Sequence, residues 1–173
     1  EHHVKHFAEM ENVQCVGFYD IDPVRAVLIG EKYKVKPYDS LQALLSDCDA
    51  VSIVTPTDTH FHIASDCINV GKHVFIEKPI TKTVAEAEQL LTLANANEVL
   101  IQVGHIERLN PALVPLKNYS ISPKYIEIQR LAPYDVRGTD VPVVLDKMIH
   151  DIDILLFLVN SEVESIDANG ISI

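Results

Sequence analysis

The sequence predicts an α/β fold: a doubly wound, Rossmann-type parallel sheet, followed by an incomplete α+β domain. From residue 13 to residue 103, short apolar runs alternate with helical segments, as in consecutive βαβ units. After Pro111 this alternation gives way to one amphipathic strand pattern, a polar loop and a long helix pattern. We therefore expect a first domain over residues 1–111 and the start of a second over residues 112–173.

The elements of the first domain follow from its apolar runs and helix caps. Strands are predicted over residues 13–19, 50–54, 74–76 and 99–103, and helices over residues 24–33, 41–45, 61–70 and 84–96. Ser40 is expected to cap the second helix, and Thr83 with Glu86 has the pattern of a capping box at the fourth. The first residues of the chain resemble the middle of a further helix.

The second region has a different pattern. Polar and apolar residues alternate over residues 121–131, which predicts a strand with one wet face. A loop is predicted over residues 133–142, a long helix over residues 143–159 and a strand over residues 163–173.

The composition limits the classes of partner. Hydrophobic residues make up 47% and charged residues 23%, an ordinary globular mixture. The formal net charge of −11 argues against nucleic acid or an anionic membrane, because both require clustered Lys and Arg. No apolar run approaches the roughly 20 residues of a membrane span, and no secretory leader is recognisable.

The three cysteines, Cys15, Cys48 and Cys67, lack the spacing of a metal site. We therefore expect them to be reduced packing residues in a cytoplasmic protein.

The segment Glu77-Lys78-Pro79 is the most informative feature of the chain. It follows the apolar run 74–76, so its charges lie at or just past the carboxyl end of a strand. In open α/β sheets this edge is where ligands bind. Lys78 is therefore a candidate for polarising the oxygen of a substrate.

Polar residues also follow the predicted strands 13–19 and 50–54. Asp20 is placed where a dinucleotide-binding unit has an acid for the ribose hydroxyls, although it can equally be an acid at a helix N-terminus. Thr55 and Pro56, with His60 close behind, lie at the ligand edge of the sheet. The alternative for this turn is simple capping of the helix at residue 61 by Thr57 or Asp58.

The last predicted strand ends in Gly104, and Arg108 follows. An arginine at a strand exit can hold an anionic ligand, since its guanidinium forms paired hydrogen bonds with phosphate. The alternative is a polar hinge between the domains, and the two interpretations are compatible.

Asp146 and His150 form a second cluster. Four residues apart on a helix they share a face, and Asp153 nearly continues the stripe. A carboxylate beside a histidine orients the ring and favours a proton acceptor near neutral pH. A metal site is the less favoured alternative, because no third ligand lies nearby in the sequence, and we expect no metal. A solvated helix face is also disfavoured, since the neighbouring residues are apolar.

In combination, these segments resemble the glucose–fructose oxidoreductase and inositol dehydrogenase (Gfo/Idh/MocA) family over nearly the whole chain. The resemblance rests on Asp20, Thr55-Pro56 with His60, residues 71–79, residues 103–108 and residues 146–150. The family's glycine-rich loop and most of its carboxyl-terminal sheet domain have no counterpart in this sequence.

The resemblance implies an NAD(P)-dependent oxidoreductase acting on a secondary hydroxyl of a sugar or cyclitol. It implies catalytic roles for Lys78, which would hold the hydroxyl and assist proton transfer, for His150 as general base and for Asp146 as orienting acid. The implied cofactor residues are Asp20, Thr55, Pro56, His60, Glu77, Lys78 and Arg108. An acid at Asp20 favours NAD over NADP, because it would repel a 2′-phosphate.

Within the family, residues 103–111, 130–144 and 146–153 are most similar to dehydrogenases that oxidise the 3-hydroxyl of UDP-N-acetylglucosamine. The implied substrate residues are Lys78, Arg108, Asn110, Tyr134, Arg137 and His150. A dehydrogenase of a free sugar or cyclitol, and a non-catalytic nucleotide-binding regulator, remain as alternatives. We expect a small-molecule substrate and a homo-oligomer, either dimer or tetramer.

Overall fold

The computed structural model describes residues 1–131, 141–159 and 161–171. The chain divides into two compact units, Glu1–Gly104 and His105–Ile173. The division falls earlier than the domain boundary at residue 111 that the sequence predicts, and the domain limits themselves stay a prediction.

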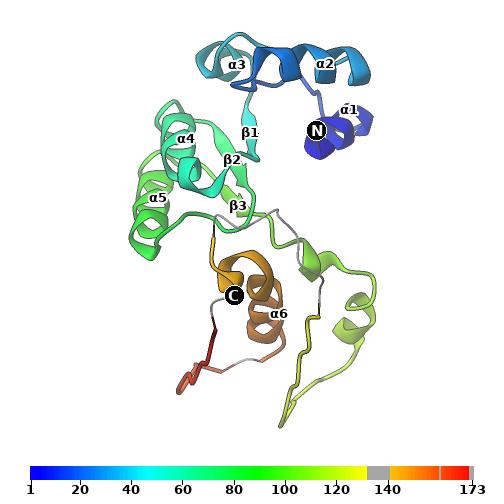
Figure 1. Cartoon of the computed structure of the whole chain (residues 1–173), viewed down its shortest axis with the longest axis vertical. Coiled ribbons are helices and arrows are strands. Elements are labelled where there is room, and N and C mark those ends of the chain that lie inside the picture. The colour runs from blue at the N-terminus through cyan, green and yellow to red at the C-terminus, as the bar shows by residue number, and fades with distance from the viewer. Residues whose placement is uncertain (132–140, 160, 172–173) are drawn as a thin grey trace. The chain divides into compact units, whose positions relative to one another are not determined.

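Unit 1, Glu1–Gly104, is built around a parallel sheet (Figure 1). Its elements are α1 (His2–Glu9), α2 (Pro23–Tyr33), α3 (Leu41–Asp47), β1 (Ala50–Ile53), α4 (Thr57–Asn69), β2 (His73–Ile76), α5 (Val84–Ala96) and β3 (Ile101–Val103). The strands pair in the order β1-β2-β3, with Ala50 opposite His73 and Val74 opposite Ile101. The alternation of strands and helices predicted from the sequence is therefore confirmed in this part of the chain.

Helix α4 begins earlier than predicted. Its first residue is Thr57, whereas the sequence predicts a start at residue 61 with Thr57 or Asp58 as a cap. Pro56 takes the N-cap position instead, and the Thr59 hydroxyl donates to the Pro56 carbonyl at 2.7 Å. Asp58 then lies in the first turn, where a negative charge interacts favourably with the helix dipole.

The predicted strand 13–19 is wrong. The described residues form a single parallel bridge there, between Phe18 and Pro37. Gly17 permits this close approach, since a Cβ at that position would lie 2.4 Å from the Lys36 carbonyl oxygen and from the Tyr38 ring. One bridge fixes a crossing point but does not make a ladder, which needs consecutive pairs.

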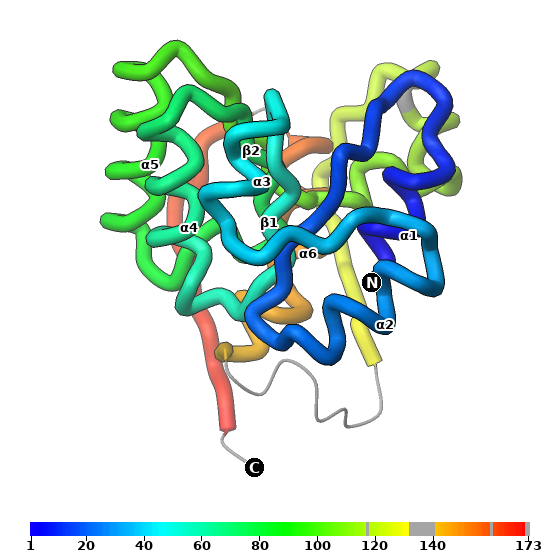
Figure 2. Tube along the Cα trace, turned by 90° about the horizontal axis from the view of Figure 1, so that it is seen from above, coloured from blue at the N-terminus to red at the C-terminus, as the bar shows by residue number. Residues whose placement is uncertain are grey.

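The core of unit 1 lies between the sheet and two helices that run side by side, α4 and α5 (Figure 2). Ile68, Ile76 and Leu90 are fully buried there together with Cys67. Burial raises the pKa of the Cys67 thiol to about 12, so this cysteine packs and does not react.

The caps predicted for α3 and α5 are confirmed, because Ser40 accepts from Ala43 N–H and Thr83 with Glu86 forms the capping box.

The described residues of unit 2 form only helical elements. These are two 3₁₀ turns (Ile106–Leu109 and Val114–Asn118), a π-helical turn (Val144–Met148) and α6 (Ile149–Leu158). The predicted helix 143–159 is thus present, in two forms of helix. The predicted strands 121–131 and 163–173 are wrong wherever the chain is described, since neither has a ladder partner there. Along the first of them, polar side chains two residues apart bond to one another, as Gln129 does to Glu127 at 2.5 Å.

Among the described helices, none combines the length and the apolar character that a membrane span requires.

Candidate active site

The carboxyl ends of the three strands come together at one edge of the sheet. The ladder continues past the strands, because Glu77 N–H donates to the Ile53 carbonyl at 3.0 Å and Gly104 N–H to the Ile76 carbonyl at 2.8 Å. The turn at Thr55, the Glu77-Lys78 pair and Gly104 therefore lie on neighbouring chain segments. This is the edge at which open parallel sheets bind ligands.

His60 ties the turns after β1 and β2 together. Its Nδ1 lies 2.9 Å from the Pro79 carbonyl oxygen and its Nε2 lies 2.8 Å from the Thr55 carbonyl oxygen. The side chain is 1% exposed, so it contributes by holding these two turns in place. The Lys78–Pro79 peptide bond is cis. Thr55 and Pro56, also predicted as cofactor residues, are exposed at the same turn.

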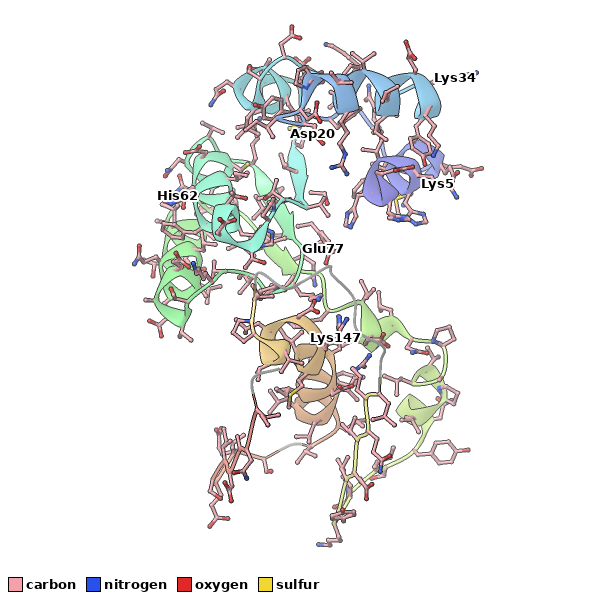
Figure 3. The ribbon with its side chains drawn as sticks, in the orientation of Figure 1. Lys5, Asp20, Lys34, His62, Glu77 and Lys147 are labelled. Atoms are coloured by element: carbon pink, nitrogen blue, oxygen red, sulfur yellow. The ribbon has the colours of Figure 1, made fainter. Side chains whose placement is uncertain are left out.

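Two groups contact the Glu77 carboxylate, one at each oxygen. Its Oε1 lies 3.0 Å from Nε2 of His3, and its Oε2 accepts from the Lys78 N–H at 3.2 Å. The Nδ1 of His3 lies 2.9 Å from the Ser52 hydroxyl oxygen. A Cβ on Gly104 would lie 3.1 Å from Glu77 Oε2, so a glycine leaves the space that the carboxylate occupies. Figure 3 labels Glu77 beside the strands of unit 1.

Sequence reasoning missed His3 and Ser52. Nothing in the sequence distinguishes His3 from His2 and His6 on the same helix, and His3 is 74 residues from Glu77. Only the fold brings them together.

Asp20 lies at the start of the segment leading into α2 (Figure 3). It lines a pocket of about 330 Å³ together with Tyr19, Pro23 and Tyr38. Its Oδ1 accepts from Asp22 N–H at 3.0 Å, and Arg25 Nε lies 3.6 Å from its Oδ2. Asp22 is the side chain that caps α2, while Asp20 lies two residues before it, so a role of Asp20 toward a ribose stays a prediction. A hollow of about 410 Å³ along α5 contains none of the predicted residues.

In unit 2, Arg108 is engaged by a buried carboxylate. Its Nε and Nη2 donate to the two oxygens of Asp153 at 2.7 Å and 2.5 Å. Burial acts to raise the pKa of Asp153, but the hydrogen bonds from Arg108 and the nearby His105 hold that pKa below its ordinary value. His105 Nδ1 lies 3.7 Å from Asp153 Oδ1. Asp153 is thus hydrogen-bonded to Arg108 and lies near His105, and contact of Arg108 with an anionic ligand stays a prediction.

The other predicted residues of unit 2 are only partly described. Asp146 lies in the π-helical turn and His150 in α6, so the two do not share one uninterrupted α-helix as predicted. Asn110 is engaged within its own turn, where it donates to Glu107 at 2.9 Å and accepts from Ala112 N–H at 3.0 Å. Tyr134 and Arg137 lie outside the described residues.

The predicted catalytic residues belong to different units. Lys78 is part of unit 1, whereas Asp146 and His150 are part of unit 2. Their assembly into a single site stays a prediction. Among the described residues, no group of three or more His, Cys, Asp or Glu side chains has the arrangement of a metal site.

Comparison with known proteins identifies the family. Residues 1–105 match the profile of GFO_IDH_MocA, described as an oxidoreductase family with an NAD-binding Rossmann fold. The sequence is 38% identical over 160 residues to a UDP-N-acetylglucosamine 3-dehydrogenase of Acidithiobacillus ferrooxidans, covering 92% of this chain and 51% of that protein. A scyllo-inositol 2-dehydrogenase (NAD(+)) of Bacillus subtilis is 29% identical over 149 residues, covering 81% of this chain and 43% of that protein.

Solved structures agree with the sequence comparison. The UDP-N-acetylglucosamine 3-dehydrogenase GnnA of A. ferrooxidans superposes with a TM-score of 0.86 at 37% identity, covering 93% of this chain and 53% of that one. An NAD-binding protein from Listeria innocua gives 0.76 at 28% identity, covering 92% of this chain and 51% of that one. The chain therefore belongs to the Gfo/Idh/MocA oxidoreductase family, and it spans about half the length of the relatives that it matches.

Proposed function

We propose that this chain is part of an NAD-dependent dehydrogenase that oxidises a secondary hydroxyl of a nucleotide sugar, the 3-hydroxyl of a UDP-N-acetylhexosamine. The observation that carries the proposal is the placement of Thr55, Glu77 and Lys78 at the carboxyl edge of the sheet. The 38% identity to a UDP-N-acetylglucosamine 3-dehydrogenase over 92% of the chain supports this choice of substrate.

The pocket beside Asp20 and the residues at the sheet edge both have features that suit a dinucleotide. The pocket beside Asp20 has aromatic and apolar walls from Tyr19, Pro23 and Tyr38, and it places a carboxylate where ribose hydroxyls can donate. Gly104 keeps the space beside Glu77 clear, since a side chain there would crowd the carboxylate. Asp20 and Asp39 both line this pocket, and acidic groups disfavour a 2′-phosphate, so NAD is proposed over NADP although Arg25 lies 3.6 Å from Asp20.

The proposed reaction converts a secondary alcohol to a ketone. When bound, the nicotinamide supplies the acceptor for the hydride that leaves the carbon. Lys78 holds the reacting hydroxyl through its ammonium group and assists proton transfer, His150 takes the hydroxyl proton, and Asp146 orients the His150 ring. Thr55, Pro56 and Glu77 line the cofactor side of the sheet edge. Arg108, Asn110, Tyr134 and Arg137 are proposed on the substrate side, and a homo-oligomer is proposed for the complete protein.

The substrate is tested with the full-length protein by following formation of reduced nicotinamide. We expect NAD to be reduced with UDP-N-acetylglucosamine and not with myo-inositol. If NAD were reduced with myo-inositol and not with the nucleotide sugar, the second candidate, a cyclitol dehydrogenase, would be favoured. The 29% identity to scyllo-inositol 2-dehydrogenase is the observation that supports this second candidate.

The role of Lys78 is tested by Lys78→Met. Turnover should fall at least about a hundredfold, because a positioned proton-transfer group contributes about 10²–10⁴ in rate. The affinity for NAD should stay within a few-fold. Lys82→Met, at an exposed position four residues on, is the matched control and should retain activity. Unchanged turnover in Lys78→Met would refute the catalytic assignment.

A further inference from the structure

We propose that His3 is a positioning residue: it fixes the Glu77 carboxylate at the cofactor edge of the sheet and so sets the affinity for the nicotinamide half of the dinucleotide. The inference rests on the proposed function, in which Glu77 lines the cofactor. It adds His3 and Ser52 to the residues that build the site.

Three elements of unit 1 contribute to this contact. His3 comes from the first turn of α1, Ser52 from β1, and Glu77 follows β2. The His3 ring is further placed by aromatic neighbours, with ring centroids 5.9 Å from Phe75 and 6.3 Å from Phe7. The imidazole is therefore fixed in position by packing as well as by its two polar contacts.

The hydrogen bonds have a definite order of donors. A neutral imidazole has one N–H and one bare nitrogen. The Ser52 hydroxyl can donate to Nδ1 at 2.9 Å, and Nε2–H can then donate to Glu77 Oε1 at 3.0 Å. The Glu77 carboxylate can only accept, so it requires the proton on Nε2, and the Ser52 hydroxyl, which can donate or accept, is free to donate to Nδ1. His3 therefore acts as a donor toward Glu77.

The other oxygen of the Glu77 carboxylate is held as well. The Lys78 N–H donates to Oε2, and Gly104, which has no side chain, leaves room for that oxygen. A glutamate side chain otherwise samples many rotamers, and fixing it costs conformational entropy on ligand binding. With His3 in place that cost is met during folding, so Glu77 is already oriented when the cofactor arrives.

The test measures binding to the full-length protein by calorimetry with two probes, NAD and ADP-ribose, which lacks the nicotinamide. In His3→Phe, which keeps a ring but removes both nitrogens, we expect NAD to bind about tenfold more weakly, the loss of one hydrogen bond to a charged group. ADP-ribose should bind within about twofold of the wild type, which also shows that the variant is folded. His3→Gln, which can still donate to Glu77, should recover most of the NAD affinity.

Two further variants make the outcome decisive. His2→Phe, at the adjacent exposed position, is the matched control and should bind both probes normally. Gly104→Ala approaches Glu77 from the other side and should weaken NAD selectively, as His3→Phe does. Equal loss of both probes, or no loss of NAD, in His3→Phe would overturn the proposal. The readout needs no sugar, so a wrong substrate assignment leaves it intact; a wild type that binds neither probe would overturn this inference and the proposed cofactor together.

Discussion

The two units hold their candidate residues by different means. In unit 1, most of the contacts that hold the candidate residues involve the main chain. Backbone hydrogen bonds continue the sheet beyond Ile76, the His60 ring contacts two backbone carbonyls, and the Lys78 N–H donates to the Glu77 carboxylate. In unit 2, the described contacts at α6 join charged side chains, with Arg108 on Asp153 and Arg130 on Asp151. Both arrangements place polar groups accurately, but they depend on different physical forces.

The difference determines what disturbs each unit. Main-chain hydrogen bonds and apolar burial change little between moderately acidic and neutral pH, since no proton is gained or lost. A carboxylate paired with arginine contributes only while it is ionised. Core substitutions should therefore affect the apolar core of unit 1 most, whereas acid should weaken the arginine–carboxylate pairs of unit 2. Hydrogen exchange resolved by peptide can follow each unit separately.

The largest expected effect on stability comes from Leu90→Ala in unit 1. Leu90 is 0% exposed in the core beneath α5, so the truncation leaves a cavity and should cost about 3 kcal/mol of local opening free energy. The loss should appear as faster exchange in β1, β2 and α4. Leu91→Ala is the matched control, because Leu91 is 53% exposed on the same helix and should cost well under 1 kcal/mol. Equal costs for the two variants would contradict the placement of the core.

Asp153→Asn should give the largest effect in unit 2. It replaces a buried carboxylate that accepts two hydrogen bonds from Arg108, and we expect a loss of about 2 kcal/mol in the protection of α6. This loss is smaller than the loss expected for a fully buried ion pair, because the Arg108 side chain is 47% exposed.

The same variant tests the pH dependence. The pKa of Asp153 is lowered in the folded state, so its contribution is fully present above the ordinary value of 3.8 and is lost as the pH falls through the folded pKa. Protection of α6 should therefore decline below about pH 4 in the wild type, and the difference from Asp153→Asn should shrink there. A difference that stays constant to pH 2 would show that Asp153 acts by packing alone.

The comparison also explains what could be predicted from the sequence. The turn at Thr55, the Glu77-Lys78 pair and the helix caps of unit 1 depend on local patterns of strand ends and capping residues, which a single sequence contains. The contact of His3 with Glu77 and the pairing of Arg108 with Asp153 join residues 74 and 45 positions apart, and no local pattern encodes either. The prediction of a strand over residues 121–131 was wrong for a related reason. Alternation of polar and apolar residues gives a segment two different faces, but it does not supply a partner strand.

The smallest expected effect is that of Asp151→Asn, which compares two arginine pairs whose carboxylates differ in burial. Arg130 donates to both oxygens of Asp151, which lowers the pKa of that carboxyl, but the Asp151 side chain is 15% exposed against 8% for Asp153, so water and salt screen this carboxylate more. We expect a loss of about 0.5–1 kcal/mol in local protection, reduced further in 1 M salt. The cost of Asp153→Asn should change less with salt, because the Asp153 side chain is 8% exposed. If both variants responded equally to salt, burial of the carboxylate would not be what separates the two pairs.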